Sequence, residues 1–167
     1  MGDIFREQLV EVRKTSAVTM KKTGIIILAV ILGLVAITFG GSLIGPLVVI
    51  GLIMGASYLI KSMNLEYEYI LTNNELDIDK IMNKERRKRL LTIDIKQINV
   101  MAHIEDGMRK GEIERAQKTI DVSSGEKGSN TYVIVFNHNE TLTKLIFEPN
   151  EDIKRDIYRQ APSKVFL

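Results

Sequence analysis

The hydrophobic pattern of the chain is dominated by one apolar block. From Thr23 to Ile60 there is no Asp, Glu, Lys or Arg in about 38 residues. A membrane-spanning helix needs about 20 residues, so the block has room for two spans. Its middle, residues 39–46, holds three glycines and Pro46, which favour a turn. The pattern therefore predicts a membrane α-helical hairpin with helices at about 24–39 and 42–60, within a membrane region 23–61.

Basic residues flank both outer ends of this block. They are Arg13, Lys14, Lys21 and Lys22 before it and Lys61 after it, whereas the connection between the helices is uncharged. Positive flanks mark the cytoplasmic side of a span. We therefore expect a multi-pass protein of the cell (cytoplasmic) membrane with N- and C-termini in the cytoplasm. The absence of Cys agrees with a reducing compartment.

The first 22 residues are predicted as a cytosolic amphipathic segment, 1–22. Ile4, Phe5, Leu9 and Val12 fall on one side of a helix over residues 3–12, and Asp3 suits its N-cap. Such a helix either lies on the membrane surface or packs on the cytosolic domain. The sequence leaves both alternatives open.

Beyond the apolar block, the period of the pattern becomes two. Seven β-rich runs follow one another, separated by turn signals such as Asn73-Asn74 and Asn137-His138-Asn139. The runs are 67–71, 75–79, 86–93, 95–104, 119–123, 131–137 and 141–147. After Pro149 the period changes to that of a helix, which ends at Ala161-Pro162. Residues 64–167 are thus predicted as a seven-strand β-domain with a C-terminal helix.

Three segments of this β-region resemble a known family. The stretch from Tyr69 to Lys80, the basic run from Arg86 to Arg89 and the segment from Ile93 to Val100 look like the opening of bacterial pleckstrin-homology (PH) like domains. The chain is similar to small two-span membrane proteins of Gram-positive bacteria, chiefly over residues 23–101. The resemblance implies an all-β PH-like barrel of seven strands, capped by the C-terminal helix. It also implies a binding or scaffolding role, although a fold does not fix a function.

The charge balance and the motifs of the chain argue against several classes of function. Residues 66–167 carry 17 basic and 18 acidic groups, so the basic excess of a nucleic-acid-binding domain is missing. His103 and His138 lie on different predicted strands without metal-ligand spacing, and no nucleophile or cofactor motif occurs. We therefore expect no nucleic-acid partner, no metal, no cofactor and no enzymatic activity.

A cluster of basic residues is the first candidate site: Lys84, Arg86, Arg87, Lys88 and Arg89. The favoured interpretation is pairing with Glu75, Asp77 and Asp79 on the neighbouring strand. The alternative is contact with anionic lipid headgroups at the membrane surface, where each basic residue adds about 1 kcal/mol.

Gly51 and Gly55 are the second candidate site, because small residues four apart let helices approach closely. Packing within the hairpin is favoured over dimerisation, which leaves a homo-oligomer as the alternative.

Together these features predict a non-enzymatic, membrane-anchored PH-like binding or scaffolding protein. Its expected partners are the lipid bilayer, and anionic lipid headgroups or another membrane protein. The alternative function is an accessory or assembly subunit of a larger membrane transport or secretion complex.

Overall fold

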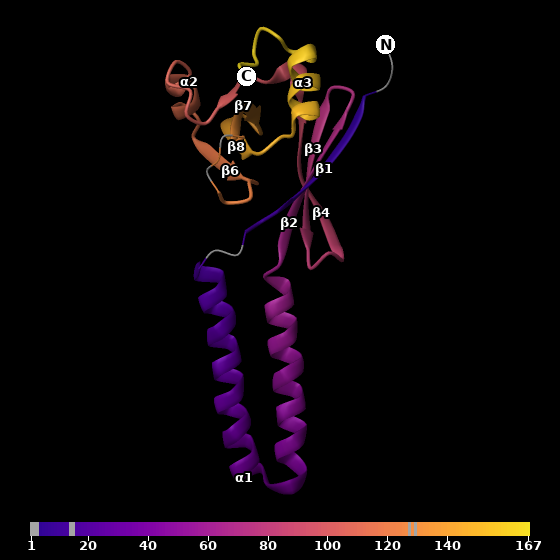
Figure 1. Cartoon of the computed structure of the whole chain (residues 1–167), viewed down its shortest axis with the longest axis vertical. Coiled ribbons are helices and arrows are strands. Elements are labelled where there is room, and N and C mark those ends of the chain that lie inside the picture. The colour runs from indigo at the N-terminus through magenta and orange to yellow at the C-terminus, as the bar shows by residue number, and fades with distance from the viewer. Residues whose placement is uncertain (1–3, 14–15, 127, 129) are drawn as a thin grey trace. The chain divides into compact units, whose positions relative to one another are not determined.

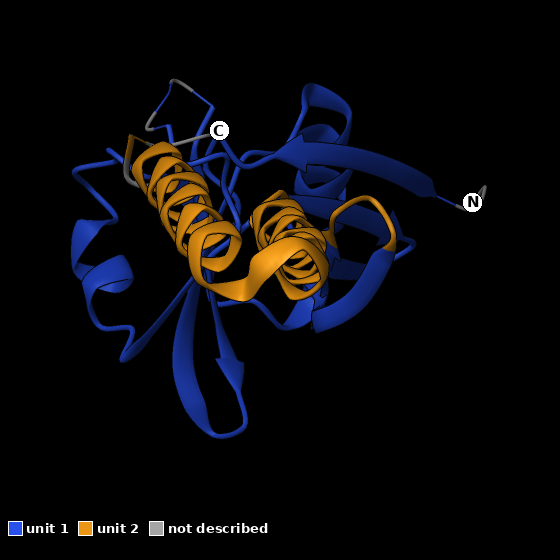
Figure 2. Ribbon diagram, turned by 90° about the horizontal axis from the view of Figure 1, so that it is seen from below, with its two compact units in different colours: residues 1–13, 66–81, 86–167 blue, residues 14–65, 82–85 orange. Residues whose placement is uncertain are grey.

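The computed structural model describes residues 4–13, 16–126, 128 and 130–167. The chain divides into two compact units, coloured separately in Figure 2. The β-unit contains Met1–Arg13, Glu66–Ile81 and Arg86–Leu167, and the hairpin unit contains Lys14–Leu65 and Met82–Glu85. Each unit is described below by itself.

The described part of the β-unit forms two four-stranded sheets (Figure 1). The first has the order β1-β2-β3-β4, with β1 (Phe5–Glu11), β2 (Leu65–Thr72), β3 (Glu75–Met82) and β4 (Arg86–Asp94). The second has the order β5-β7-β8-β6, with β5 (Val100–His103), β6 (Lys118–Asp121), β7 (Tyr132–His138) and β8 (Thr141–Phe147). Strand β6 runs parallel to β8, whereas β5 and β8 are antiparallel to β7.

The main core lies between the two sheets and the C-terminal helix α3 (Glu151–Gln160). Tyr69 and Leu76 come from the first sheet, Leu145 from the second, and Ile153 and Ile157 from α3, and all five are fully buried. Asn150 caps α3 by accepting a hydrogen bond from the Ile153 N–H at 2.9 Å. The predicted C-terminal helix is confirmed, and its two isoleucines pack into the core shared with the sheets.

The predicted seven-strand barrel is corrected. Within the described residues neither sheet closes on the other, and an eighth strand is present. The run predicted at 95–104 is also interrupted, because Ile95–Gln97 forms a 3-10 turn before β5 begins. Asp94 caps that turn through the Lys96 N–H at 2.9 Å. A short helix, α2 (Lys110–Glu114), lies between the runs predicted at 95–104 and 119–123.

The eighth strand is β1, where a helix over residues 3–12 was predicted. That prediction is wrong for the described residues Phe5–Glu11, and Asp3, the predicted N-cap, lies outside the described residues. The same residues also alternate: Arg6, Gln8 and Val10 occupy one face of β1, and Phe5 and Leu9 the other. Pairing with β2 over the full length of β1, from Phe5↔Thr72 to Glu11↔Glu66, supplies backbone hydrogen bonds. An isolated helix shorter than about 12 residues is marginal in water, so the strand pairing prevails.

Side chains of β1 fasten it to distant parts of the β-unit. Arg6 Nε donates to Asp156 Oδ2 on α3 at 2.8 Å. The Gln8 amide donates to the Glu148 carbonyl at 2.8 Å and accepts from the Asn150 N–H at 2.7 Å. The N-terminal segment is therefore an integral strand of the β-unit.

The hairpin unit consists mainly of α1 (Ser16–Ser62), which breaks at Gly41 into two helical arms, 16–40 and 42–62. The backbone of Gly41 has φ 65° and ψ −169°, a conformation that other residues rarely adopt. The arms run side by side in opposite directions (Figures 1 and 2). The predicted helical hairpin is present, with its turn inside the predicted segment and with arms extending beyond 24–39 and 42–60.

The hairpin interrupts the β-unit in sequence. It follows β1 and precedes β2, and these two strands are paired as far as Glu11↔Glu66. The chain therefore leaves the β-unit and returns to it through neighbouring strands.

Candidate functional site

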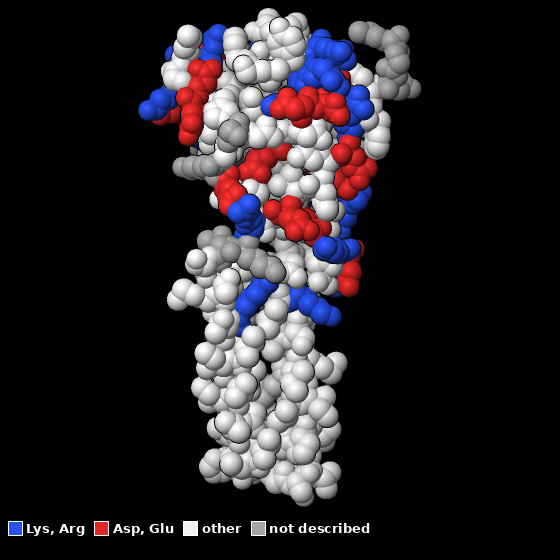
Figure 3. Space-filling view, in the orientation of Figure 1, with Lys and Arg blue, Asp and Glu red and all other residues white. Residues whose placement is uncertain are grey.

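The outer surface of α1 is almost entirely apolar. No charged residue occurs from Thr23 to Ile60, and most large side chains of both arms are exposed to the surroundings. Figure 3 shows this as an uncoloured surface along the arms, with basic atoms at their open end. Among the described residues one helix, Val18–Ser62, is long and apolar enough to cross a membrane, by length and composition.

Glycines bring the two arms together near the turn. A Cβ atom on Gly45 would lie 3.0 Å from the Ala36 carbonyl oxygen and 3.1 Å from Ile37 Cα. A Cβ on Gly40 would lie 2.9 Å from the Gly45 nitrogen. Only glycine permits so close an approach of backbones.

The two glycines singled out from the sequence lie elsewhere. A Cβ on Gly51 or Gly55 would meet no atom within 4 Å in the described chain. They therefore do not make the contact between the arms, and the close-approach role belongs to Gly40 and Gly45. The spacing of small residues identified the kind of contact but not the face of the helix that makes it.

Lysines gather at the open end of the hairpin. Lys21 and Lys22 belong to the first arm and Lys61 to the second. Lys22 Nζ donates to Asn64 Oδ1 at 2.8 Å, which bridges the two ends of the hairpin. The Asn83 N–H donates to the Asn64 carbonyl at 3.0 Å, so the turn carrying Lys84 belongs to the same end of the hairpin unit.

The turn at Asn83 and Lys84 explains how the basic run is presented. Both residues have positive φ, 54° and 58°, as in the tight turns that join antiparallel strands. Strand β4 begins two residues later, and successive side chains then point to opposite faces of the sheet. The five basic residues therefore do not form one patch.

One half of the basic run is engaged in ion pairs. Arg89 Nη1 lies 2.6 Å from Asp77 Oδ2, and Arg89 also bonds to Asp79. Arg87 Nη2 lies 2.8 Å from Glu68 Oε1 on β2. The predicted pairing with neighbouring acids is confirmed for Arg89, and Arg87 uses a partner that the sequence did not indicate.

The other half faces away from these acids. Arg86 and Lys88 are exposed, and no ion pair or hydrogen bond of their side chains is found in the described chain. Arg86 and Lys88 are therefore the members of the predicted cluster that point away from Asp77, Asp79 and Glu68. Glu75, the third acid considered as a partner, is exposed at the start of β3.

Other candidate features have internal roles. The His103 ring accepts the Glu105 N–H at 3.2 Å and packs edge-on against Tyr132. Within the described residues, no group of three His, Cys, Asp or Glu side chains could hold a metal ion. Burial raises the pKa of Tyr69, whose hydroxyl donates to the Val122 carbonyl at 2.6 Å and locks the first sheet to the loop after β6.

Two sheets that share a core with a C-terminal helix packed on it are an arrangement expected of a PH-like domain, a class of general binding modules. The family comparison agrees: a model described as a bacterial PH-like domain (DUF6106) matches residues 2–167. The chain belongs to this family, and the match includes β1 and the hairpin as well as the later strands. No curated protein and no solved structure matches the chain.

Proposed function

We propose that this protein is a non-enzymatic, membrane-anchored PH-like binding module. In this proposal both arms of α1 cross the cytoplasmic membrane, and the β-unit and both termini lie in the cytoplasm. The observation that carries the proposal is a charge-free hairpin inserted between two paired strands, with lysines at its open end and no charge at its turn. Basic residues flanking spans favour the cytoplasmic side.

The topology is the first thing to test. Because the chain has no Cys, a single engineered cysteine gives an unambiguous label. Ser42→Cys sits at the hairpin turn and Ser163→Cys at the exposed C-terminal end. In sealed right-side-out vesicles, a membrane-impermeant maleimide should label Ser42→Cys at once and Ser163→Cys only after permeabilisation. Labelling of Ser163→Cys in intact vesicles, or release of the protein by alkaline carbonate, would contradict the proposal.

The ligand class follows from the chemistry of the exposed cations. Arg86 and Lys88 suit anionic lipid headgroups, each adding about 1 kcal/mol near a charged surface. A protein partner with an acidic surface would use the same groups. Photo-crosslinking from Lys88 in native membranes, followed by mass spectrometry of the adduct, distinguishes a lipid from a protein.

A second function is favoured by one observation. A Cβ added to Gly51 or Gly55 would meet no atom of the other arm within 4 Å, so a helix of another membrane protein could approach this face of the second arm closely. On this proposal the chain is an accessory or assembly subunit of a larger membrane complex. Gly51→Leu with Gly55→Leu should then abolish co-purification of a partner while the thermal unfolding of the β-unit is unchanged.

A further inference from the structure

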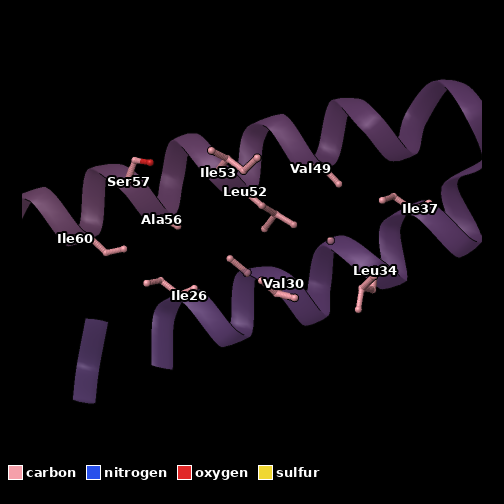
Figure 4. Close-up of a pocket in the computed structure, with 12 residues that line it drawn as sticks. Ile26, Val30, Leu34, Ile37, Val49, Leu52, Ile53, Ala56, Ser57 and Ile60 are labelled. Atoms are coloured by element: carbon pink, nitrogen blue, oxygen red, sulfur yellow. The ribbon is translucent and has the colours of Figure 1, made fainter. Parts of the chain in front are cut away.

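The two arms of α1 enclose a groove on the open-end side of their contact. The groove has a volume of about 370 Å³ and is lined by both arms (Figure 4). The residues that keep it open are small: Ala29 and Gly33 on the first arm and Ala56 and Ser57 on the second. A Cβ on Gly33 would lie 3.7 Å from Val49 Cγ2 on the other arm.

The depth of the groove corresponds to one leaflet of a bilayer. Its lining on the first arm extends from Ile26 to Ile37. The eleven steps from one residue to the next, at about 1.5 Å each, give roughly 16 Å along the arm. The hydrocarbon core is about 30 Å thick, so this is about half of it, the depth that one acyl chain occupies. Apart from Ser57 the lining is apolar, which excludes water as a stable occupant.

Basic residues follow the groove lining along both arms toward their open end. Lys22 lies four residues before Ile26, one helical turn closer to the open end, and Lys61 directly follows Ile60, which also lines the groove. Lys22 donates one hydrogen bond to Asn64, and an ammonium group can donate three. Residues 16–65 contain no Asp or Glu, so no acid of the arms competes for these lysines.

An apolar groove of leaflet depth, followed by basic residues toward the open end of the arms, matches one amphiphile. We infer that the groove holds one acyl chain of an anionic phospholipid, whose phosphate is bound by Lys22 and Lys61. This inference rests on the proposed function, because it requires α1 to span the membrane. A helix from a second copy would fill the apolar part but leave the lysines without an anion, since the arms carry no acidic residue. The site is thus assigned to lipid.

The test uses the full-length protein in bilayers of equal phosphatidylglycerol and phosphatidylcholine. After detergent extraction, native mass spectrometry counts the lipids that remain bound. We expect about one phosphatidylglycerol per chain and little phosphatidylcholine, as for basic pockets between membrane helices. Gly33→Leu and, independently, Ala56→Leu fill the groove and should lower retention about tenfold.

The matched control is Gly24→Leu. It makes the same change as Gly33→Leu on the same arm, at a glycine whose Cβ would meet nothing within 4 Å and which does not line the groove. It should retain lipid like the unmodified chain. Lys22→Gln should reduce the preference for phosphatidylglycerol over phosphatidylcholine while leaving the groove open.

Several outcomes would overturn the inference. They are the absence of retained lipid in the unmodified chain, equal retention of both lipids, and equal loss in Gly24→Leu and Gly33→Leu. Cysteine crosslinking between two copies through Ala56→Cys, without retained lipid, would assign the groove to a second copy. The labelling pattern of Ser42→Cys, measured in each variant background, shows whether the hairpin is inserted. If it is inserted and no lipid is retained, this inference fails while the proposed function stands; if it is not inserted in the unmodified chain, both fail.

Discussion

Glu68 is a buried carboxylate with an incomplete set of partners. It is 3% exposed, and its Oε1 accepts from Arg87 at 2.8 Å, whereas its Oε2 has no hydrogen-bond partner in the described chain. Burial raises the pKa of Glu68 from its usual value near 4.5, and neighbouring Glu7 and Asp79 raise it further. Arg87 acts in the opposite direction without cancelling the rise. The carboxyl therefore keeps its proton to higher pH in the folded protein than in the unfolded chain.

This difference gives a pH-dependent prediction. Between about 4.5 and the raised pKa, the folded state holds a proton that the unfolded chain has released, so the free energy of unfolding falls as pH rises through that window. Glu68→Gln removes the titration and keeps an acceptor for Arg87. We expect the variant to show a flatter dependence of Tm on pH and a Tm at pH 8 equal to or above that of the unmodified protein.

The control for this prediction is Glu75→Gln, the same change at an exposed position of β3. It should leave the pH dependence of Tm unchanged. A Tm of Glu68→Gln that falls more than that of the unmodified protein as pH rises would contradict the assignment of the titration to Glu68.

At the scale of elements, we expect substitutions on the two faces of β4 to change the free energy of unfolding by different amounts. Arg87→Gln with Arg89→Gln leaves the buried carboxylates of Glu68 and Asp79 without cationic partners. The arginine side chains are about half exposed, which reduces the cost through solvent screening, so we expect a loss of about 1–3 kcal/mol in the free energy of unfolding. Arg86→Gln with Lys88→Gln should change it by less than about 0.5 kcal/mol.

The same two double variants separate stability from binding. Arg86→Gln with Lys88→Gln should weaken flotation of the β-unit with anionic vesicles at low salt. The comparison is made at equal fractions of folded protein. If vesicle binding is lost only in Arg87→Gln with Arg89→Gln, the lipid contact lies on the other face of the sheet.

The hairpin turn gives a prediction for the helical element. Gly45→Val places side-chain atoms against the backbone of Ala36 and Ile37, so the arms must separate. A Cβ on Gly33 would lie 3.7 Å from Val49 Cγ2, so a cysteine pair at these two positions should crosslink in the unmodified background and several-fold less with Gly45→Val. Gly55→Val, at an open position, is the control and should crosslink normally; equal loss in both variants would contradict the packing described for the turn.

Across the whole molecule, the sequence pattern predicted the strands, turns and helices that are specified by residues close together in the sequence. Strands β2, β3 and β8 have alternating residues, β7 is a short continuous apolar run, and tight turns join β2 to β3 and β7 to β8. Asn73 adopts the positive φ of 51° that its turn signal implies. The hairpin follows from an uninterrupted apolar block. These features need only a few adjacent residues to specify them.

Features that depend on distant partners were not predictable in the same way. Glu11 pairs with Glu66, and the whole hairpin lies between these two residues in the sequence. Residues 5–11 form a strand because they pair with β2, and β2 is too far along the chain to be read from the local pattern. Arg87 similarly finds Glu68 on a strand that is not its neighbour in the sheet order. For Gly51 and Gly55 the spacing was informative, but the rotation of the second arm about its axis decides which small residues meet the first arm.

The position of β1 leads to a prediction about the minimal folded domain. Residues 65–167 alone lack β1, the contacts of Arg6 and Gln8, and a partner for one edge of β2. Joining residues 4–12 to 65–167 through a glycine-containing loop of about four residues restores the strand. We expect the joined form to unfold cooperatively and 65–167 to melt at least about 10 °C lower or to aggregate, by circular dichroism and light scattering.

Gln8→Ala in the joined form is the matched control. It keeps β1 but leaves the Glu148 carbonyl and the Asn150 N–H without their side-chain partner, so its Tm should fall between the other two. A fragment 65–167 as stable as the joined form would show that β1 is dispensable.

The placement of the hairpin between β1 and β2 also orders events during synthesis. Strand β1 leaves the ribosome long before its partner exists, and the two meet only when both arms have been made. With both arms across the bilayer, as proposed, the strands emerge on the same side and pair. In a chain with only its first arm inserted, β1 and β2 would lie on opposite sides of the membrane. Completion of the first sheet thus depends on correct insertion, which would make a mis-inserted chain recognisable to quality-control proteases by its incomplete β-unit.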